Sequence, residues 1–559
     1  MRWALVACAF STAAAYLTPS RRRAASPIAR PAREAAGDDD SAPELPDDVS
    51  EARARLIART MGGGSLTEGS DTKAVQEGWA YETPLLEAGC VLLGGTEQDF
   101  GFGLRQQYFH KCVLLLTQHD DQFTRGVIVN RPSRREINGW TVWCGGDVEE
   151  GGVFAPLGRK ESKGRPPALE CLSTRDVEGA RRVSKGLWTS TFESANKVVK
   201  AGAAEKTDFM CLCGYAGWAP KQLDGEVERS SWHVAAADGG SLVAELLAKE
   251  EDADAPLDDG LKTWASLMAR IGKDAAPDGF DFDDGMLRAW IDARLDAPRM
   301  DVSALADAAR RQTRQEAFMK TITGNNGAIK PGAVLACQHV TGSDFLLEKQ
   351  YLHKALIQVI AVQQELVIAC VLNRPTSRKI SLRLSPESEK SKTVAFGGDV
   401  QVKSAAGGVV WLSRGPLGDK GERLPLGSVK GSSEGDADAT HVISAKDVVV
   451  ELQKASAFQA DRVLAASGVV AFHVDELARM LGVGHLLPVP LDDAPLEECW
   501  ALHSDDVSTP GMTPDGCWHA AFLAGVGAHA SCAPPATPAE LNGGLADEAL
   551  TRFIKTFLA

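Results

Sequence analysis

The stretch that decides the fold is FMCLCGYAGWAPKQLDGEVE, residues 209–228. Its first five residues, Phe209 to Cys213, form a short apolar run that is typical of a strand buried on both faces. Pro220 suits the first position of a helix, because the N–H group at that position has no intrahelical partner. The glycines of the intervening GYAGW, residues 214–218, permit a tight turn. The stretch therefore predicts a strand that runs through residues 214–218 into a helix over residues 220–228.

Two more apolar runs, at residues 112–116 and 126–129, are bounded by polar turns and predict further buried strands. Both lie in a segment that recurs. Residues 89–132 align without gaps to residues 332–375, with 12 identical positions among 44. The identities include Tyr108/Tyr351, His110/His353, Lys111/Lys354 and the triplet Asn-Arg-Pro at 130–132 and 373–375. Such self-similarity predicts two copies of one domain.

Two later segments extend the repeat. Gly145-Gly146-Asp147 is echoed by Gly397-Gly398-Asp399, and we align residues 258–264 with residues 547–553. Because Ala275 to Asp284 is acidic and contains Gly and Pro, it predicts a joint between the copies. We therefore expect five segments along the chain. They are a signal plus transit peptide at 1–40, a linker at 41–80, a first domain at 81–275, an acidic joint with linker helices at 276–325, and a diverged second domain at 326–559.

Composition excludes one class of function. The 559 residues carry 60 Lys and Arg against 75 Asp and Glu, a formal net charge of -15. General nucleic-acid binding needs clustered positive charge, so it is not expected. The 12 cysteines include no CxxC pair, which argues against a zinc ribbon and favours a reducing compartment. The sequence indicates no cofactor and no metal site.

The N-terminus predicts targeting. Residues 3–16 are mostly apolar, too short to span a bilayer, and suit a signal peptide. Five arginines then appear before the first acidic residue, Glu34, as in an organelle transit peptide. The apolar segment followed by the arginine-rich segment resembles the bipartite presequence of algae with complex plastids, and it predicts a location in the plastid stroma. A plain secretory signal with a linker remains the alternative. After processing, we expect a soluble protein without a membrane segment.

Several motifs occur in the order of one known family. GCVLL at 89–93, VNRP at 129–132, CGGD at 144–147, GYAGWAPKQLDGEVERSSW at 214–232 and LKTWASLMARIG at 261–272 resemble the YqgE/AlgH family, also called UPF0301 or DUF179. The resemblance implies an α/β (α+β) fold in which a bifurcated sheet forms a pseudo-barrel flanked by helices, here as two tandem domains. It gives the family's role as unassigned, with transcriptional regulation proposed.

The chain departs from the family in places. Both copies have Gly-Gly-Asp where the family usually has Gly-Gly-Pro, and Cys112 stands where Ser or Thr is usual. The second copy aligns Gly468-Val469-Val470-Ala471-Phe472 with GYAGW, so it lacks the tyrosine, the second glycine and the tryptophan.

GYAGW is open to two interpretations. Tyr215 and Trp218 either fill core volume or line a ligand-facing loop, whose N–H groups at a helix start suit an anion. His110 and His353 recur beside a lysine, which favours a strand-edge or inter-copy contact over catalysis. The candidates for ligand or partner binding are Asn130, Arg131, Gly145, Gly146, Asp147, Gly214, Tyr215, Gly217, Trp218, Gln222 and Glu226.

The sequence thus favours a non-catalytic binding or regulatory module. Its expected partner is an unidentified protein or a small anionic ligand, and the two repeats are expected to pack within one chain. The alternative is an enzyme acting on a small anionic substrate in a pocket of the first domain. In that case His119, Asp147 and Glu226 are the candidate acid and base groups.

Overall fold

The computed structural model describes these residues: 79–95, 102–148, 153–154, 168–249, 256–273, 282–296, 329–337, 344–363, 366–385, 388–402, 408–415, 422–424, 440–454, 463–482, 485–490, 496–503, 513–528 and 544–558. The expected signal and transit peptide lies outside them, as does the linker except for residues 79–80. Of the expected joint only residues 282–296 are described. Contacts divide the chain into two units, with the division between residues 299 and 300. No helix among the described residues is long and apolar enough to cross a membrane.

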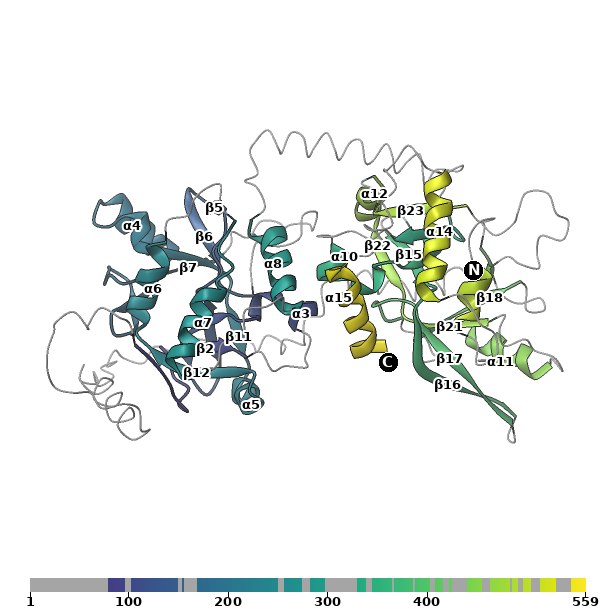
Figure 1. The fold of residues 1–559 in the computed structure, drawn as a ribbon, viewed down its shortest axis with the longest axis horizontal. Coiled ribbons are helices and arrows are strands. Elements are labelled where there is room, and N and C mark those ends of the chain that lie inside the picture. Colours follow the sequence, from purple (N-terminus) through teal and green to yellow (C-terminus); the bar gives the residue numbers. More distant parts are fainter. Residues whose placement is uncertain are drawn as a thin grey trace, which may run out of the picture. The chain divides into compact units, whose positions relative to one another are not determined.

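The first unit contains two six-stranded sheets, which we call sheet A and sheet B. Figure 1 labels several of their strands, among them β2 and β12 of sheet A and β6 and β7 of sheet B. Sheet A has the strand order β1 (Ala80–Glu82), β12 (Trp232–Ala237), β2 (Val91–Gly94), β3 (Val113–His119), β4 (Thr124–Ile128) and β11 (Ala216–Trp218). Sheet B has the order β5 (Arg135–Ile137), β6 (Trp140–Cys144), β10 (Phe209–Cys213), β7 (Leu169–Ser173), β9 (Leu187–Thr191) and β8 (Arg181–Ser184).

The two sheets exchange chain segments. Strand β10 of sheet B lies parallel to β6, passes through Gly214 at φ 82°, and continues as β11 of sheet A. The end of β4 likewise reaches the end of β6, since Ile128 N donates to Gly145 O over 2.8 Å. This is a bifurcated sheet, and the α/β (α+β) fold class expected from the sequence is confirmed by the mixture of sheets and helices.

The apolar core of the first unit lies between sheets A and B. Alternate residues of the strands point into it, among them Val127 and Val129 from the β4 segment and Leu172 from β7. The helices are α3 (Phe102–Arg105), α4 (Phe192–Lys200), α5 (Gln222–Glu228), α6 (Gly239–Leu247), α7 (Leu261–Arg270) and α8 (Phe282–Arg294), with short 3-10 turns at η3 (Gln107–Phe109) and η4 (Lys206–Asp208). Helices α6 and α7 contribute Leu242, Val243, Trp264 and Leu267 to the same core.

The predicted strand at 209–213 is present as β10, and the chain continues through GYAGW to a helix that begins two residues later than predicted. GYAGW contains strand β11, which pairs with β4, and α5 begins at Gln222 rather than at Pro220. The reason is local: Lys221, the residue before the helix, has φ 62°, a left-handed conformation that a helix cannot contain.

The second unit also has two sheets, labelled sheet C and sheet D. Sheet C has the order β22 (Val470–His473), β15 (Leu366–Val371), β14 (Leu356–Val362), β13 (Val334–Cys337) and β23 (Leu486–Val489). Sheet D has the order β16 (Pro375–Ser385), β17 (Ser388–Phe396), β21 (Val463–Ser467), β18 (Val409–Arg414), β20 (Thr440–Ile443) and β19 (Glu422–Arg423). Strands β16 and β17 form a long hairpin that projects from this unit (Figure 1).

The remaining elements of the second unit are the helices α10 (Asp344–Leu347), α11 (Ala445–Lys454), α12 (Val474–Gly482), α13 (Leu496–Ala501), α14 (Pro514–Ala528) and α15 (Leu545–Phe553), the 3-10 turn η5 (Gln350–Leu352) and a terminal π turn η8 (Ile554–Leu558). The chain again crosses between the sheets, because β21 lies parallel to β17 and passes through Gly468 into β22.

One expected alignment was wrong. Asn130 donates to Gly260 O and Asn373 to Pro514 O, while the indoles of Trp264 and Trp518 donate to Gly94 O and Cys337 O. Helix α14 therefore corresponds to α7, and residues 258–264 do not correspond to residues 547–553. Helix α15 corresponds instead to α8, which lies at the start of the expected joint. The two segments are alike in sequence because Asp258 and Asp259 stand just before α7, whereas Asp547 and Glu548 lie in the first turn of α15.

Candidate functional site

Asn130 ties three chain segments together. Its Oδ1 accepts from Val113 N over 2.8 Å, and its Nδ2 donates to Lys111 O and to Gly260 O. Asn373 makes the same bonds in the second unit, to Leu356 N, Lys354 O and Pro514 O. Both side chains are fully buried, so every polar group of this amide is committed to the backbone.

Arg131 is a buried cation held by backbone carbonyls. Its guanidinium donates to Asn130 O and Asp259 O over 3.0 Å each, and also to His110 O. Burial lowers the pKa of Arg131, and the same cause lowers the pKa of Arg374 to about 10. The structure thus gives Asn130 and Arg131 a role in bracing the strand crossing, away from solvent.

Gly145, Gly146 and Gly214 bring two turns into backbone contact. A Cβ atom on Gly146 would lie 2.2 Å from the Tyr215 carbonyl carbon, and one on Gly145 would lie 2.3 Å from Gly214 O. No side chain fits there, which explains the glycines at the ends of the parallel strands β6 and β10. Val148 and Tyr215 then exchange backbone hydrogen bonds of 2.9 and 3.2 Å.

Asp147 follows this contact at the surface. Although the residue is exposed overall, desolvation of its carboxyl raises the pKa of Asp147, and a hydrogen bond with the Tyr108 hydroxyl counteracts that rise. In the second unit the Tyr351 hydroxyl donates to Asp399 over 2.7 Å. The aspartate that replaces the family's usual proline therefore has the same partner in both units.

Trp218, Gln222 and Glu226 form one network at α5. Glu226 Oε2 accepts from the indoles of Trp218 and Trp232 over 2.8 and 2.9 Å, and its Oε1 accepts from Gln222 Nε2 over 3.0 Å. Trp218 is 4% exposed. The carboxylate is thus satisfied by α5 and its neighbours. Gly217, in the edge strand β11, lies beside the ring of Phe123.

The recurring histidine and lysine pair with an aspartate of their own unit. His110 Nε2 lies 2.6 Å from Asp284 Oδ1, and Lys111 Nζ lies 2.8 Å from the same oxygen. Burial would raise the pKa of Asp284, but the hydrogen bonds from His110 and Lys111 lower it. His353 and Lys354 contact Asp547 in the second unit. The expected strand-edge or inter-copy contact is therefore corrected: each pair anchors a helix, α8 or α15, onto its own unit.

The sequence reasoning missed a polar cluster in the core of the first unit, formed by Thr117, Arg125, Glu170, Thr189 and Tyr215. Arg125 continues the inward-facing row of Val127 and Val129. Its guanidinium pairs with Glu170 of sheet B, and it lies 4.5 Å from the centroid of the Tyr215 ring.

Hydrogen bonds extend the polar cluster. The Thr189 hydroxyl donates to Glu170, the Thr117 hydroxyl donates to Arg125 O over 3.4 Å, and Arg181 donates to Thr117 O over 2.8 Å. The side chains of Arg125 and Glu170 are 27% and 13% exposed. One sequence signal could have revealed the cluster. Arg125 is a charged residue in a row of alternate apolar positions, and the second copy has Ile368 at the aligned position.

Strand pairing gives the equivalents in the second unit. The polar cluster corresponds, in the order above, to the aliphatic residues Ile360, Ile368, Val410, Val442 and Val469. All five belong to the apolar core of that unit or pack against it. The same position between two sheets is therefore polar in one unit and apolar in the other.

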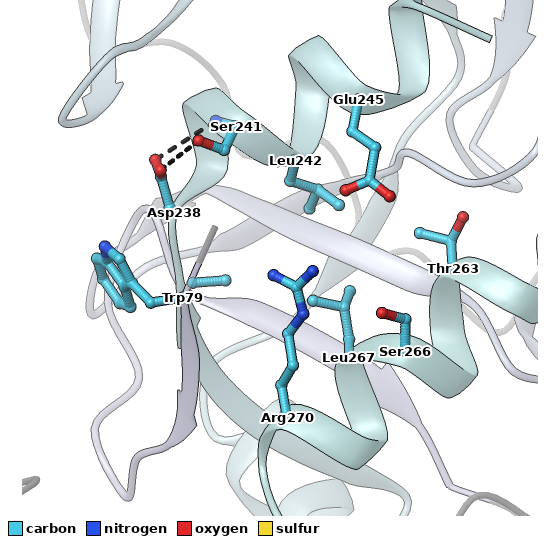
Figure 2. Close-up of a pocket in the computed structure, with 10 residues that line it drawn as sticks. Trp79, Asp238, Ser241, Leu242, Glu245, Thr263, Ser266, Leu267 and Arg270 are labelled. Carbon is cyan, nitrogen blue, oxygen red and sulfur yellow. Dashed lines mark hydrogen bonds between the residues drawn. The ribbon is translucent and has the colours of Figure 1, made fainter. Parts of the chain in front are cut away.

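A small hollow, open to solvent, lies between α6 and α7 (Figure 2). Glu245 extends from α6 and Arg270 from α7 toward the same space, and Asp238 accepts from Ser241 N and hydroxyl at its rim. None of the sequence candidates lines it. Among the described residues, no group of three or more His, Cys, Asp or Glu side chains could hold a metal ion.

The three acid and base candidates have different partners. His119 Nδ1 contacts the Thr124 hydroxyl over 2.8 Å, Asp147 contacts Tyr108, and Glu226 lies between two indoles. The described contacts do not join them into one constellation.

Comparison with known proteins gives a match to one family model. Residues 102–276 match the family model described as AlgH-like, DUF179. The first unit carries an AlgH-like domain. The resemblance expected from the sequence motifs is thereby confirmed, and all of the matched residues lie within this unit.

Relatives of the AlgH-like domain are named UPF0301 proteins. One from Chlorobaculum parvum is 26% identical over 162 residues, covering 28% of this chain and 78% of the relative. One from Rhodococcus jostii is 28% identical over 178 residues, covering 30% and 79%.

Two solved structures are also similar. The AlgH protein from Pseudomonas aeruginosa is 17% identical, with a TM-score of 0.22, and the match covers 38% of this chain and 100% of that one. The protein DIP2367 from Corynebacterium diphtheriae is 18% identical, with a TM-score of 0.23, and covers 34% and 89%.

Proposed function

We propose that this chain is a non-catalytic binding module of the plastid, in which the AlgH-like first unit holds a small anionic ligand at the polar cluster. The observation that carries the proposal is the difference between the two cores: Arg125, Glu170 and Tyr215 stand where the second unit has aliphatic side chains. Tyr215 connects the polar cluster to the GYAGW segment that the sequence singled out.

The fold itself does not require these polar groups. Replacing a buried ion pair by apolar residues of similar volume is often neutral or stabilising, because desolvating two charges is costly. The second unit builds the same strand crossing with Ile368 and Val410 in their place. Retention of a partly exposed ion pair in the first unit therefore supports a role beyond folding.

Arg125 supplies the chemistry for an anion. A guanidinium has five N–H donors and binds carboxylate or phosphate in a forked geometry. Among the described residues, Glu170 contacts a single nitrogen of it, Nη1. Arg181 adds a second cation beside Thr117, and Tyr215 offers a hydroxyl. A small carboxylate or phosphate is the ligand class that suits this set.

Arg125→Ile tests the proposal, because isoleucine is the residue of the second unit. The full chain is incubated with plastid extract, washed, and its retained small molecules are identified by mass spectrometry. We expect an anion that the wild type retains and Arg125→Ile loses. Arg175→Ile is the matched control, since Arg175 pairs with Asp208 at an exposed site. Equal retention by Arg125→Ile, or no retained anion, would contradict the proposal.

The plastid location rests on the sequence of residues 1–40. A fluorescent protein placed behind residues 1–43 is expected to enter the plastid of a complex-plastid alga. Secretion of the fusion would favour the alternative of a plain secretory signal.

We also propose that the second unit is a diverged copy of the first. The shared bonds of Asn130 and Asn373, and the shared contacts of His110 and His353, support a duplication. Superposition of the two units in a crystal structure tests it: Asn130 and Asn373 are expected to coincide, and their placement on unrelated elements would contradict duplication.

A further inference from the structure

The hollow between α6 and α7 of the first unit is not used by the proposed function. Glu245 extends into it from α6 and Arg270 from α7, so opposite charges face one small space (Figure 2). The lining between them is apolar, because Leu242 and Leu267 lie there and are 7% and 6% exposed. The hollow therefore presents a carboxylate and a guanidinium on either side of an apolar surface.

Trp79 lies at one end of the hollow and Thr263 at the other (Figure 2). The position of Trp79 is fixed, since its carbonyl accepts from Asp238 N over 2.9 Å and its ring stacks on Tyr81 with the centroids 5.4 Å apart. Trp79 is nonetheless 50% exposed. A half-exposed indole beside a hollow offers apolar surface that a ligand can cover.

The polar groups of the hollow can accept and donate at the same time. In the ranges that the structure describes, no donor or cation contacts the Glu245 carboxylate. Arg270 has five N–H donors in a planar fork, a geometry that suits a carboxylate. The Ser266 hydroxyl, one turn before Arg270 on α7, lines the same space. A ligand in the hollow therefore meets an anionic acceptor on one wall and a cationic donor on the other.

The fold does not need the polar groups on α7. Helix α14 corresponds to α7, and the tryptophan of each helix donates its indole hydrogen to a strand carbonyl. At the same spacing from these tryptophans, α14 has Ala520 and Ala524 where α7 has Ser266 and Arg270. The second unit thus packs this helix without a charge at these positions, which supports a role for Arg270 beyond folding.

We propose that the hollow binds a free α-amino acid with an apolar or aromatic side chain. Such a molecule carries an ammonium group and a carboxylate on one carbon. Its ammonium group donates to the Glu245 carboxylate, and its carboxylate accepts from the Arg270 guanidinium. Its side chain covers Leu242, Leu267 and the Trp79 indole. A simple anion is disfavoured because Glu245 repels it, and a simple cation is disfavoured because Arg270 repels it.

The test titrates the full chain with L-phenylalanine in a calorimeter. Because both charges lie near solvent, their contacts are screened, and we expect a Kd of about 0.1–1 mM. Two analogues each lack one charge: 3-phenylpropionate has no ammonium group, and phenylalaninamide has no carboxylate. Each analogue is expected to bind at least about fivefold more weakly than L-phenylalanine, since each loses one ion pair.

Arg270→Ala places the second unit's residue in the first. It and Glu245→Gln are each expected to weaken L-phenylalanine binding at least about fivefold while leaving the circular dichroism spectrum unchanged. Lys262→Ala is the matched control, because Lys262 is an exposed cation of the same helix that does not line the hollow. Its affinity is expected to equal that of the wild type.

Three results would overturn the proposal. They are the absence of L-phenylalanine binding up to about 10 mM, an analogue that binds as tightly as L-phenylalanine, and an unchanged affinity in Arg270→Ala. The proposal does not depend on anion binding at the polar cluster, so Arg125→Ile is expected to keep its affinity for L-phenylalanine. A loss of L-phenylalanine binding in Arg125→Ile would place the amino acid at the polar cluster and would also contradict the assignment to the hollow.

Discussion

Asn130 in the first unit and Asn373 in the second make the same three hydrogen bonds, whereas Arg125 and Ile368, five residues upstream of each, differ in charge, shape and partners. The asparagines satisfy buried backbone groups where the chain crosses between sheets, and an orphaned group there costs free energy. At the position of Arg125 and Ile368, by contrast, the fold requires only that a side chain fill the space between the two sheets. The two units therefore differ in the lining of the core and agree where the chain passes from one sheet to the other.

The largest effect on stability is expected at the two asparagines, where the chain passes from one sheet to the other. Asn130→Ala leaves Val113 N, Lys111 O and Gly260 O without a side-chain partner, at about 1–3 kcal/mol for each unsatisfied buried group. We expect a loss of about 3–5 kcal/mol in the free energy of unfolding of the first unit, measured by urea denaturation. Asn373→Ala is expected to have a similar effect on the second unit. A small effect of either would show that the two crossings are not equivalent.

The aspartates that anchor α8 and α15 sharpen the comparison. The Asp284 side chain is 9% exposed and that of Asp547 is 34% exposed. Because removing one partner of a buried ion pair costs about 3–5 kcal/mol, Asp284→Asn is expected to approach that range, and Asp547→Asn to cost about 1–2 kcal/mol. Denaturant melts of the two variants measure both. Equal losses would contradict the role of exposure.

The Asp284 contact also predicts a pH dependence. Its folded pKa is lowered, so its stabilisation is present above the unfolded pKa of about 3.9 and is lost as the pH falls through the folded value. The difference in stability between wild type and Asp284→Asn is therefore expected to shrink below about pH 4. Melts at pH 7 and at successively lower pH measure it, and a constant difference would contradict the assignment.

Trp218→Phe places in the first unit the residue that the second has at position 472. The variant keeps most of the apolar volume and loses one indole hydrogen bond to Glu226, which retains Trp232 and Gln222. We expect a loss of about 1.5 kcal/mol or less, within the range for near volume-conserving core changes. A loss above about 3 kcal/mol in urea melts would show that the indole bond is essential to α5.

The smallest effect is expected from copying the lining of the second unit. The double variant Arg125→Ile, Glu170→Val removes both charges together, so no unpaired charge remains and the change in stability is expected to lie within about 1 kcal/mol of zero. Glu170→Val alone is expected to cost more, because it leaves the guanidinium unpaired. If the double variant is the less stable of the two, the polar cluster contributes to folding after all.

Regular patterns in the sequence predicted much of the fold. The apolar run at 209–213 predicted strand β10, and the gapless alignment of residues 89–132 with 332–375 covers strands that share a bulge, after Leu116 and after Val359. Local periodicity cannot reveal which sheet a short strand joins. The sequence therefore predicted that the chain runs through GYAGW into a helix, and it did not indicate that three residues of GYAGW pair with β4 of the other sheet.

Contacts between distant residues were harder to predict. The pairing of Asp284 with His110 spans 174 positions, and the one with Lys111 spans 173. Composition alone placed the segment around Asp284 in a joint between domains. Arg125 was missed because a charged residue in a strand is usually expected on the solvent face, and only the opposing Glu170 from the other sheet makes its inward position favourable.

The passage of β10 through Gly214 into β11 has a consequence for how the first unit opens. Each sheet contains a strand that is covalently continuous with a strand of the other, and β1 forms one edge of sheet A by pairing with β12, more than 150 positions away. The two sheets therefore cannot separate unless the β10–β11 segment loses its pairing in one of them. Amide protons of β3 in one sheet and β7 in the other should therefore exchange with solvent water through the same rare, global opening.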